Sequence, residues 1–253
     1  QTWKAKVSST PSDQSVGVLR GIDRVCKQAG VAPKEIQHVM HGTTVATNTV
    51  LTGTGARVGL VTTTGYRQVL QIARSFVPGG LGGWVIYNKS LPMAPLSLTI
   101  EAHERVSSQG EVVTPLDEAK LREDLRALGT KKIEALTVSL INAFSNDRHE
   151  QRIKQIAQQE LPGIPVSLSS EVVPEMQEYE RTVTTVANSY VRPRVQKYVH
   201  NLKSKLDAKM KNVKLHILRS DGGLASARSA EDFPVNLLMS GPAGGVTGAL
   251  WVA

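Results

Sequence analysis

The sequence predicts an α/β protein with a largely parallel sheet and flanking helices. Strand patterns alternate with helix patterns along the whole chain, and most connections between them are short. The run Ile133–Ile141 is almost continuously apolar, which is typical of a central parallel strand. The chain has 253 residues, enough for one large domain or two small ones, and we expect a boundary, if the chain divides, in the Gly- and Pro-rich region 78–95.

The first half of the chain contains three predicted strands and three predicted helices. Thr10-Pro11-Ser12-Asp13 favours a helix start, and Gly30 favours its end. By alternation and helical spacing we expect strands at 3–9, 36–40 and 57–63, and helices after Asp13, at 45–51 and at 66–73.

The second half continues the alternation. The run Thr114-Pro115-Leu116-Asp117 opens a helix with Leu121, Leu125 and Leu128 on one face, and Asn146-Asp147 opens another. Further strands are expected at 133–141, 164–168 and 213–218, with an extended segment at 97–107. A long helix follows Glu178, and Pro193 is expected to kink or break it.

Composition narrows the class of protein. Hydrophobic residues make up 40% and charged residues 21% of the chain, which is ordinary for a globular protein. No stretch approaches a membrane span, and the N-terminus has no signal-peptide core. The single cysteine, Cys26, rules out an intramolecular disulfide and has core spacing, so we expect a cytoplasmic protein without membrane contact.

The net charge of +8 comes partly from one lysine-rich segment. A nucleic-acid surface would favour arginines and interleaved aromatic residues, which are few here. We interpret the segment as a solvated helix face and expect no nucleic-acid partner; its lysines are Lys197, Lys203, Lys205, Lys209, Lys211 and Lys214.

The run His41-Gly42-Thr43-Thr44 is the first candidate site, because it joins a predicted strand to a predicted helix. A glycine turn and a hydroxyl at a helix start leave backbone N–H groups pointing outward from a strand end, where ligands gather in α/β sheets. The alternative is local: a threonine caps the helix and His41 makes a nearby hydrogen bond. The spacing of His38 and His41 does not indicate a metal site, and we expect none.

Three other segments have a functional and a structural interpretation. A tight turn is predicted at Ser220-Asp221-Gly222-Gly223. A helix start, with Ser240 as N-cap, is predicted at Ser240-Gly241-Pro242-Ala243-Gly244-Gly245. This helix start either contacts another backbone closely or faces an anion. Phe76–Trp84 is an active-site lid or a plain surface loop, and it lacks the Lys-Ser/Thr of a Walker loop. Glu178, Glu180 and Arg181 are catalytic or substrate-binding residues, or charges paired in a first helical turn.

Taken together, these motifs resemble the hydantoinase/oxoprolinase family, of the ATP-hydrolysing N-methylhydantoinase A subunit type. The resemblance covers essentially the whole chain and rests on 41–48, 60–66, 178–182 with 184–186, 220–223 and 240–246. The loop 77–81 looks more like the hydantoinase and lactamase branch than the oxoprolinase branch.

The resemblance implies a fold and an activity. The fold would be the actin/Hsp70/sugar-kinase (ribonuclease H-like) ATPase type, with the nucleotide in a cleft between two lobes. The enzyme would use ATP and Mg²⁺ to activate a cyclic amide of the hydantoin, 5-oxoproline or lactam type, or a ketone in the carboxylase branch. It would work with a B-type hydantoinase subunit or domain, and we expect an oligomer.

The chain departs from the family pattern at both ends. An Asp-x-Gly-Gly-Thr-x-Thr-Asp hairpin normally precedes the strand that Gln1-Thr2-Trp3 resembles, and a second such hairpin normally follows the glycine-rich helix. We therefore expect residues 1–253 to be the N-terminal lobe of a longer ATPase, inactive alone, with the hydantoinase A core region starting in 170–253. A non-catalytic interaction lobe is the alternative if the chain ends at Ala253.

The resemblance also adjusts the site. Gly241–Ala249 resembles the connecting helix between lobes, which favours a hinge or cleft-lining role over direct phosphate binding. The candidate catalytic residues are His41, Glu180 and Arg181. The candidate cleft-lining residues for the nucleotide are Gly42, Thr43, Thr44, Gly222, Gly223, Gly241, Gly244 and Gly245.

Overall fold

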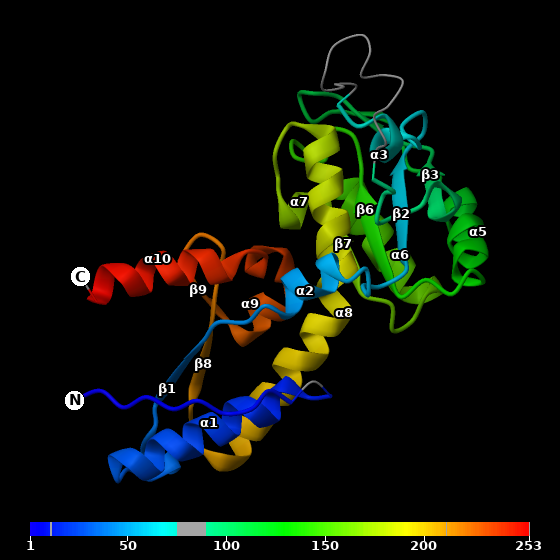
Figure 1. Ribbon diagram of the computed structural model, residues 1–253. Coiled ribbons are helices and arrows are strands. Elements are labelled where there is room, and N and C mark those ends of the chain that lie inside the picture. The colour runs from blue at the N-terminus through cyan, green and yellow to red at the C-terminus, as the bar shows by residue number, and fades with distance from the viewer. Residues whose placement is uncertain (11, 75–89, 211, 253) are drawn as a thin grey trace. The chain divides into compact units, whose positions relative to one another are not determined.

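The computed structural model describes residues 1–10, 12–74, 90–210 and 212–252 (Figure 1). The chain divides into two compact units: unit 1 comprises residues 1–54 and 194–253, and unit 2 comprises residues 55–193. The boundary expected in 78–95 and the candidate lid at 76–84 fall largely or wholly outside the described residues, so both stay predictions.

Unit 2 contains a four-stranded parallel sheet. Its strands are β2 (Val58–Thr63), β3 (Thr99–Ala102), β6 (Ala135–Ser139) and β7 (Val166–Leu168), in the order β3-β2-β6-β7. Every residue of β2, β6 and β7 is buried, as their apolar runs predict. A short antiparallel pair, β4 (Arg105–Val106) and β5 (Val112–Thr114), and the short helices η3 (Leu96–Leu98), α3 (Val69–Ile72) and α7 (Ser169–Val172) complete the connections.

Helices cover both faces of this sheet. The helices α5 (Glu118–Gly129) and α6 (Arg148–Glu160) pack on one face through Leu121, Leu125, Ile153 and their neighbours. On the other face, the first half of α8 (Glu178–Lys209) packs through Val186 against the strands (Figure 1). The helix expected after the run 114–117 starts at Glu118, and the Asp117 carboxylate caps it by accepting a hydrogen bond from the Lys120 N–H at 3.0 Å.

Unit 1 contains the three-stranded sheet β1-β8-β9. The strands β1 (His38–His41) and β8 (Lys214–Leu218) are parallel, with His41 opposite Ile217, and β9 (Leu224–Ser226) is antiparallel to β8. The remaining elements are α1 (Gln14–Ala29), η1 (Pro33–Glu35), α2 (Val45–Leu51), α9 (Ala227–Asp232), η4 (Pro234–Leu237), α10 (Ser240–Val252) and the second half of α8.

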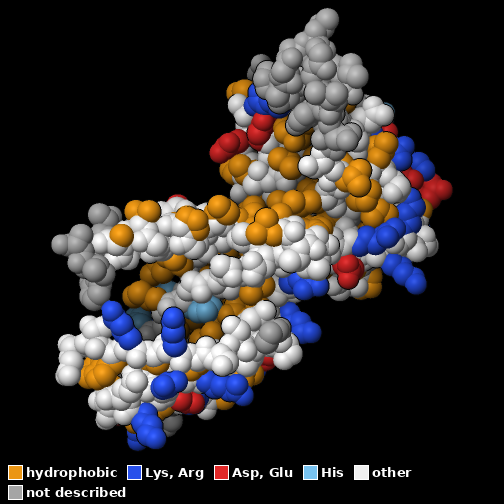
Figure 2. Space-filling model, viewed as in Figure 1, with side chains coloured by type: hydrophobic (Ala, Val, Ile, Leu, Met, Phe, Trp, Pro, Cys, Tyr) orange, Lys and Arg blue, Asp and Glu red, His pale blue; other side chains and the backbone are white. Residues whose placement is uncertain are grey.

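Ion pairs tie α1 to α8 within unit 1. Lys205 pairs with Asp13, and its ammonium donates to the Ser15 hydroxyl at 2.8 Å; Lys209 pairs with Asp23. Part of the lysine-rich segment is therefore a salt-bridged helix face. On the face shown in Figure 2, Lys and Arg side chains are scattered among other types.

Three predicted details differ from the structure. Residues 1–10 contain no strand, so the prediction from Trp3 to Ser9 is wrong: alternation alone does not supply a hydrogen-bonding partner strand. Pro193 does not break α8, which runs through it, with the flanking Val191 and Val195 fully buried. Ser240 is the first residue of α10 rather than its cap.

None of the helices in the described ranges combines the length and apolar composition that a bilayer span requires.

Candidate functional site at the carboxyl ends of β1 and β8

Two candidate segments leave the sheet of unit 1 side by side. Because β1 and β8 are parallel neighbours, their carboxyl ends lie at the same edge of the sheet. The run Gly42–Thr44 after β1 and the turn 219–223 after β8 therefore both start from this carboxyl edge. The structure therefore brings together glycines and hydroxyls that lie almost 180 positions apart in sequence. Gly42, Thr44 and Gly223 are exposed there.

Both threonines after β1 make side-chain hydrogen bonds at the start of α2, but Thr44, which occupies the N-cap position, makes none to a backbone N–H of that helix. The Thr43 hydroxyl accepts a hydrogen bond from the Val45 N–H at 3.3 Å, and the Thr44 hydroxyl accepts one from the Asn48 amide at 3.3 Å. Thr43 is 9% exposed, whereas Thr44 is open to solvent. The Thr43 hydroxyl is thus used within the turn, and Gly42 and Thr44 are the exposed groups available to a ligand.

His41 closes β1 and makes a buried contact. Its Nε2 lies 2.6 Å from the hydroxyl oxygen of Tyr198 on α8. Burial lowers the pKa of His41 below its ordinary value, because the charged imidazolium would lose its hydration. His41 is therefore neutral at physiological pH, when it can accept a proton or a hydrogen bond.

The turn after β8 is held by a carboxylate. Asp221 accepts a hydrogen bond from the Gly223 N–H at 2.9 Å and pairs with Arg219 at 2.8 Å. The Gly223 N–H and the Arg219 cation hold the pKa of Asp221 below its ordinary value. Gly222 has φ 82°, a conformation that glycine adopts without steric cost, as the Asp-Gly-Gly run predicts.

The start of α10 is joined to this edge by two hydrogen bonds. The Ser240 hydroxyl donates to the Thr43 carbonyl at 3.2 Å, and the Met239 N–H donates to the Thr47 hydroxyl at 3.1 Å. Met239 has φ 60°, which is unfavourable for a side chain of its kind. The structure thus places Gly241 and its helix beside the run after β1.

The predicted close approach of α10 occurs at Gly244 and not at Gly245. A β-carbon on Gly244 would lie 2.5 Å from Cδ2 of Leu218, the last residue of β8. A β-carbon on Gly245 or on Gly241 would meet nothing within 4 Å among the described residues. The expectation that Gly245 is in tight contact is therefore wrong, because successive helical residues point in different directions.

Arg181, a candidate catalytic residue in unit 2, is 1% exposed and its donors are used inside the protein. Its guanidinium donates to the Leu140 carbonyl at 2.7 Å, the Glu175 carbonyl at 2.7 Å and the Ser169 hydroxyl at 3.2 Å. Burial lowers its pKa, while the nearby Glu150 opposes that shift. This placement favours a structural role.

Glu180, its neighbour, forms an ion pair of 2.5 Å with Arg74 at the surface of unit 2. That pairing holds the pKa of Glu180 below its ordinary value. The catalytic roles of Glu180 and Arg181 stay predictions, and neither residue belongs to the unit that holds His41.

A buried polar network that sequence analysis did not identify closes the carboxyl edge of the sheet in unit 2. Glu104 accepts hydrogen bonds from the Thr63 hydroxyl and from Nδ1 of His149, the latter at 2.7 Å. Glu150 accepts from the Leu140 N–H at 2.9 Å and the Ser169 hydroxyl at 2.6 Å. The strand order reverses at β2, which lies between β3 and β6. An open α/β sheet binds ligands at the carboxyl ends of its strands next to such a reversal. In this chain the carboxylates of Glu104 and Glu150 occupy that place.

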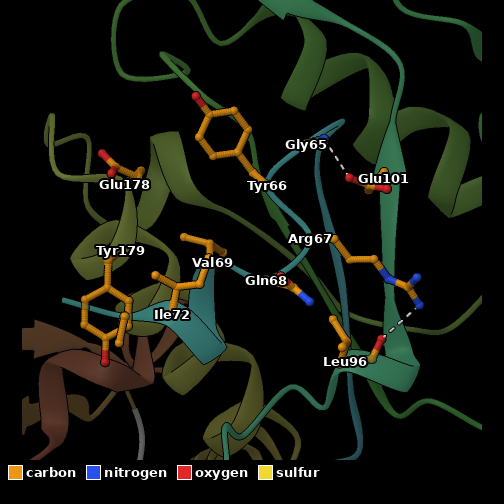
Figure 3. A pocket seen from close by; sticks show the side chains of 11 residues that line it. Gly65, Tyr66, Arg67, Gln68, Val69, Ile72, Leu96, Glu101, Glu178 and Tyr179 are labelled. Atoms are coloured by element: carbon orange, nitrogen blue, oxygen red, sulfur yellow. Dashed lines mark hydrogen bonds between the residues drawn. The ribbon is translucent and has the colours of Figure 1, made fainter. Parts of the chain in front are cut away.

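Unit 2 also has a pocket of about 430 Å³ beside the segment that follows β2 (Figure 3). Val69 and Tyr179 contribute apolar surface, and Glu101 and Glu178 contribute carboxylates. Glu101 accepts a hydrogen bond from the Gly65 N–H at 2.6 Å. The volume is in the range of small-molecule pockets, about 300–1,000 Å³. The local motifs contain several of these residues, but no sequence signal shows that they share a pocket.

No group of three or more His, Cys, Asp and Glu side chains in the described ranges is arranged to hold a metal ion.

Comparison with known proteins assigns the chain to a family. The family model described as the hydantoinase/oxoprolinase N-terminal region matches residues 1–161. The family model described as hydantoinase/oxoprolinase matches residues 181–253. The chain belongs to the hydantoinase/oxoprolinase family. The family predicted from the motifs is thereby confirmed.

Two curated members of the family resemble the chain along nearly its whole length. The acetophenone carboxylase gamma subunit of Aromatoleum aromaticum is 31% identical over 273 residues, covering 98% of this chain and 36% of that subunit. The caprolactamase subunit alpha of Pseudomonas jessenii is 30% identical over 252 residues, covering 98% of this chain and 36% of that subunit. The chain thus spans about a third of the length of these relatives.

Two solved structures have the same fold. The ATP-dependent caprolactamase from Pseudomonas jessenii superposes with a TM-score of 0.83 at 30% identity, covering 94% of this chain and 35% of that one. A nucleotide-free acetone carboxylase superposes with a TM-score of 0.87 at 23% identity, covering 97% of this chain and 36% of that one. The predicted α/β ATPase-type fold is confirmed.

Proposed function

We propose that this chain is part of an ATP-dependent enzyme that activates and opens a cyclic amide of the hydantoin, 5-oxoproline or lactam type. Membership of the hydantoinase/oxoprolinase family supports the proposal, as does the likeness to an ATP-dependent caprolactamase over 94% of the chain. An amide is a poor electrophile because of its resonance. ATP would supply a phosphoryl group that makes the carbonyl oxygen a good leaving group.

The observation that carries the proposal is the shared edge at the ends of β1 and β8. Gly42, Thr44 and Gly223 are exposed at that edge. Glycines let a bulky anion approach the backbone, and hydroxyl groups donate hydrogen bonds to phosphate oxygens. These groups fit a phosphate-bearing ligand. Asp221 is the carboxylate of the turn, and Mg²⁺ in nucleotide sites is often held by one or two carboxylates together with the phosphates.

In this account each part of the edge has its own task. Gly42, Thr44 and the turn Gly222–Gly223 bind the phosphates, and Gly241 lines the cleft from α10. His41, kept neutral by burial, accepts or relays a hydrogen bond at the same strand end.

Carboxylation of a ketone is the second candidate function. The specific observations in its favour are the 31% identity to an acetophenone carboxylase subunit and the structural likeness to an acetone carboxylase. The two functions share activation of a carbonyl oxygen, and they differ in the second reactant. A cyclic amide hydrolase consumes water, whereas a ketone carboxylase consumes bicarbonate.

We further propose that the protein works with a B-type hydantoinase subunit or domain. Two relatives are named as subunits of larger enzymes, which supports this assembly. A cytoplasmic location stays a prediction.

The proposal is tested with the full-length protein and its partner subunit, ATP, Mg²⁺ and a panel of substrates. Hydantoin, 5-oxoproline and caprolactam are compared with acetone and acetophenone, each with and without bicarbonate. We expect ADP release to match ring opening and to be independent of bicarbonate. Ring opening without ATP would contradict the proposal, and turnover confined to ketone with bicarbonate would favour the second candidate.

A matched pair of variants tests the edge itself. Among the described residues, a β-carbon on Gly42 would meet only Leu218, at 3.8 Å, and one on Gly21 in α1 would meet only Val7, at 3.7 Å. Both Gly42→Ala and Gly21→Ala should therefore fold. We expect Gly42→Ala to raise the KM for ATP by about tenfold, because a methyl group blocks the phosphate, which corresponds to about 1.4 kcal/mol. Equal KM values for the two variants would remove Gly42 from the site.

A further inference from the structure

Tyr198, which sequence analysis did not single out as a site residue, makes a partly buried hydrogen bond at the carboxyl end of β1. Its hydroxyl oxygen lies 2.6 Å from Nε2 of His41, and the two ring centroids are 5.9 Å apart at an interplanar angle of 46°. Tyr198 is 6% exposed. The contact therefore joins α8 to the last residue of β1.

The Thr43 side chain lies beside the same hydroxyl and opposes the rise in its pKa. His41 and Thr43 flank the exposed Gly42, so one phenolic group is bonded to one neighbour of that glycine and lies beside the other. Burial raises the pKa of Tyr198 to about 12, so the hydroxyl keeps its proton at neutral pH. With a single hydrogen, it can donate to one of these side chains and accept from the other.

Charge and geometry favour one direction for this hydrogen-bond chain. Burial keeps His41 neutral, so Nε2 is free to accept from Tyr198. The Thr43 oxygen already accepts from the Val45 N–H, and its own hydrogen is free to be donated to Tyr198. In this arrangement the imidazole proton of His41 resides on Nδ1.

We propose that Tyr198 is a positioning residue that holds His41 as the Nδ1–H tautomer and fixes the backbone of Gly42–Thr44 for the phosphates. Tyr198 acts through His41 and Thr43 and does not touch the ligand. The second half of this proposal rests on the proposed function, whereas the tautomer of His41 does not.

The first test is nitrogen-15 NMR of the histidine rings in the protein and in its Tyr198→Phe variant. We expect His41 to show the Nδ1–H tautomer in the wild type and a mixture, or the Nε2–H tautomer, in the variant. An Nε2–H tautomer in the wild type, or one pattern in both proteins, would overturn the assignment. This readout needs no substrate.

The second test is kinetic and uses Tyr190→Phe as the control, because it removes the same atom from the same helix. Tyr190 packs its ring on Gly55. We expect Tyr198→Phe to raise the KM for ATP or to lower kcat/KM by about tenfold, the worth of one hydrogen bond, with a melting temperature close to that of Tyr190→Phe.

The outcomes separate the positioning role from the proposed function. A Tyr198→Phe enzyme with wild-type kinetics would overturn the positioning role while leaving the proposed function intact. A wild-type enzyme that neither binds nor hydrolyses ATP would overturn the proposed function and with it the phosphate-positioning half, while the NMR result still decides the tautomer.

Discussion

The Arg181 guanidinium donates a hydrogen bond of 2.7 Å to the carbonyl oxygen of Leu140. Leu140 follows β6, and Arg181 lies in the first turn of α8, so the contact ties the helix to the carboxyl edge of the sheet in unit 2. The cation also lies near the buried Glu150. A motif residue that sequence analysis proposed for catalysis is thus part of the internal framework of unit 2.

Replacing Arg181 with Met should destabilise the protein by about 3–5 kcal/mol, because it leaves Glu150 and several carbonyls buried without their cation. Urea unfolding measures the effect. Arg74→Ala is the control, since it removes the exposed partner of the adjacent Glu180 and should shift the urea midpoint little. An unchanged midpoint in Arg181→Met with loss of turnover would show that Arg181 acts in the chemistry.

Alanine substitutions at the neighbouring Gly244 and Gly245 of α10 should differ in their effect on stability. Alanine is better than glycine inside a helix by roughly 0.5–1 kcal/mol, so Gly245→Ala, with open space around it, should raise the unfolding midpoint. Gly244→Ala gains the same term, but Leu218 must move away from the added methyl group. We expect Gly244→Ala to be less stable than Gly245→Ala by about 1 kcal/mol. Equal denaturant midpoints would show that α10 does not approach β8 closely.

Local signals predicted much of the fold. The helix start expected from the run 10–13 is found directly after it, where the Asp13 side chain accepts from the Ser15 N–H, and Gly30 adopts φ 68° at the end of α1, as the glycine position indicates. The apolar run around β6 proved to be a fully buried parallel strand. The sequence signals behind these predictions, a cap, a glycine and an apolar run, each involve residues within a few positions of one another.

The features that sequence analysis missed depend on distant residues. His41 and Tyr198 are 157 positions apart, and Glu104 and His149 are 45 apart. No spacing rule brings such pairs together, because the sheet and helix packing decide which side chains meet. The strand predicted at 3–9 failed for the same reason. Its residues alternate as in a strand, but a strand forms only where a neighbouring strand pairs with it.

Gly55 offers a sharper steric test than Gly244. A β-carbon at Gly55 would lie 2.2–2.4 Å from ring carbons of Tyr190, and the Ala56 N–H donates to the Tyr190 carbonyl at 2.8 Å. Because both the ring and the backbone are held, Gly55→Ala should cost about 1–3 kcal/mol in urea unfolding. Adding Tyr190→Ala should make the glycine substitution nearly neutral. An additive double mutant would contradict the contact.

The lowered pKa of His41 gives a pH dependence with a definite sign. Unfolding exposes His41 and returns its pKa to about 6.5, so the unfolded chain binds a proton that the folded chain resists. Stability from this residue is complete above about pH 6.5 and is lost as the pH falls below it. His41→Gln should therefore lose less stability than the wild type between about pH 7.5 and pH 5.5 in urea titrations. Parallel curves for the two proteins would contradict the burial of a neutral His41.

The central claim is that ATP activates the carbonyl oxygen of a cyclic amide, and an oxygen-18 label on that oxygen tests it most directly. The full-length enzyme with its partner is given ATP, Mg²⁺ and the labelled substrate, and the released phosphate is analysed by mass spectrometry. If the oxygen is phosphorylated, it leaves with the phosphate, so we predict close to one labelled oxygen in the phosphate per ring opened. Phosphate without label, with the ring still opened, would contradict the account.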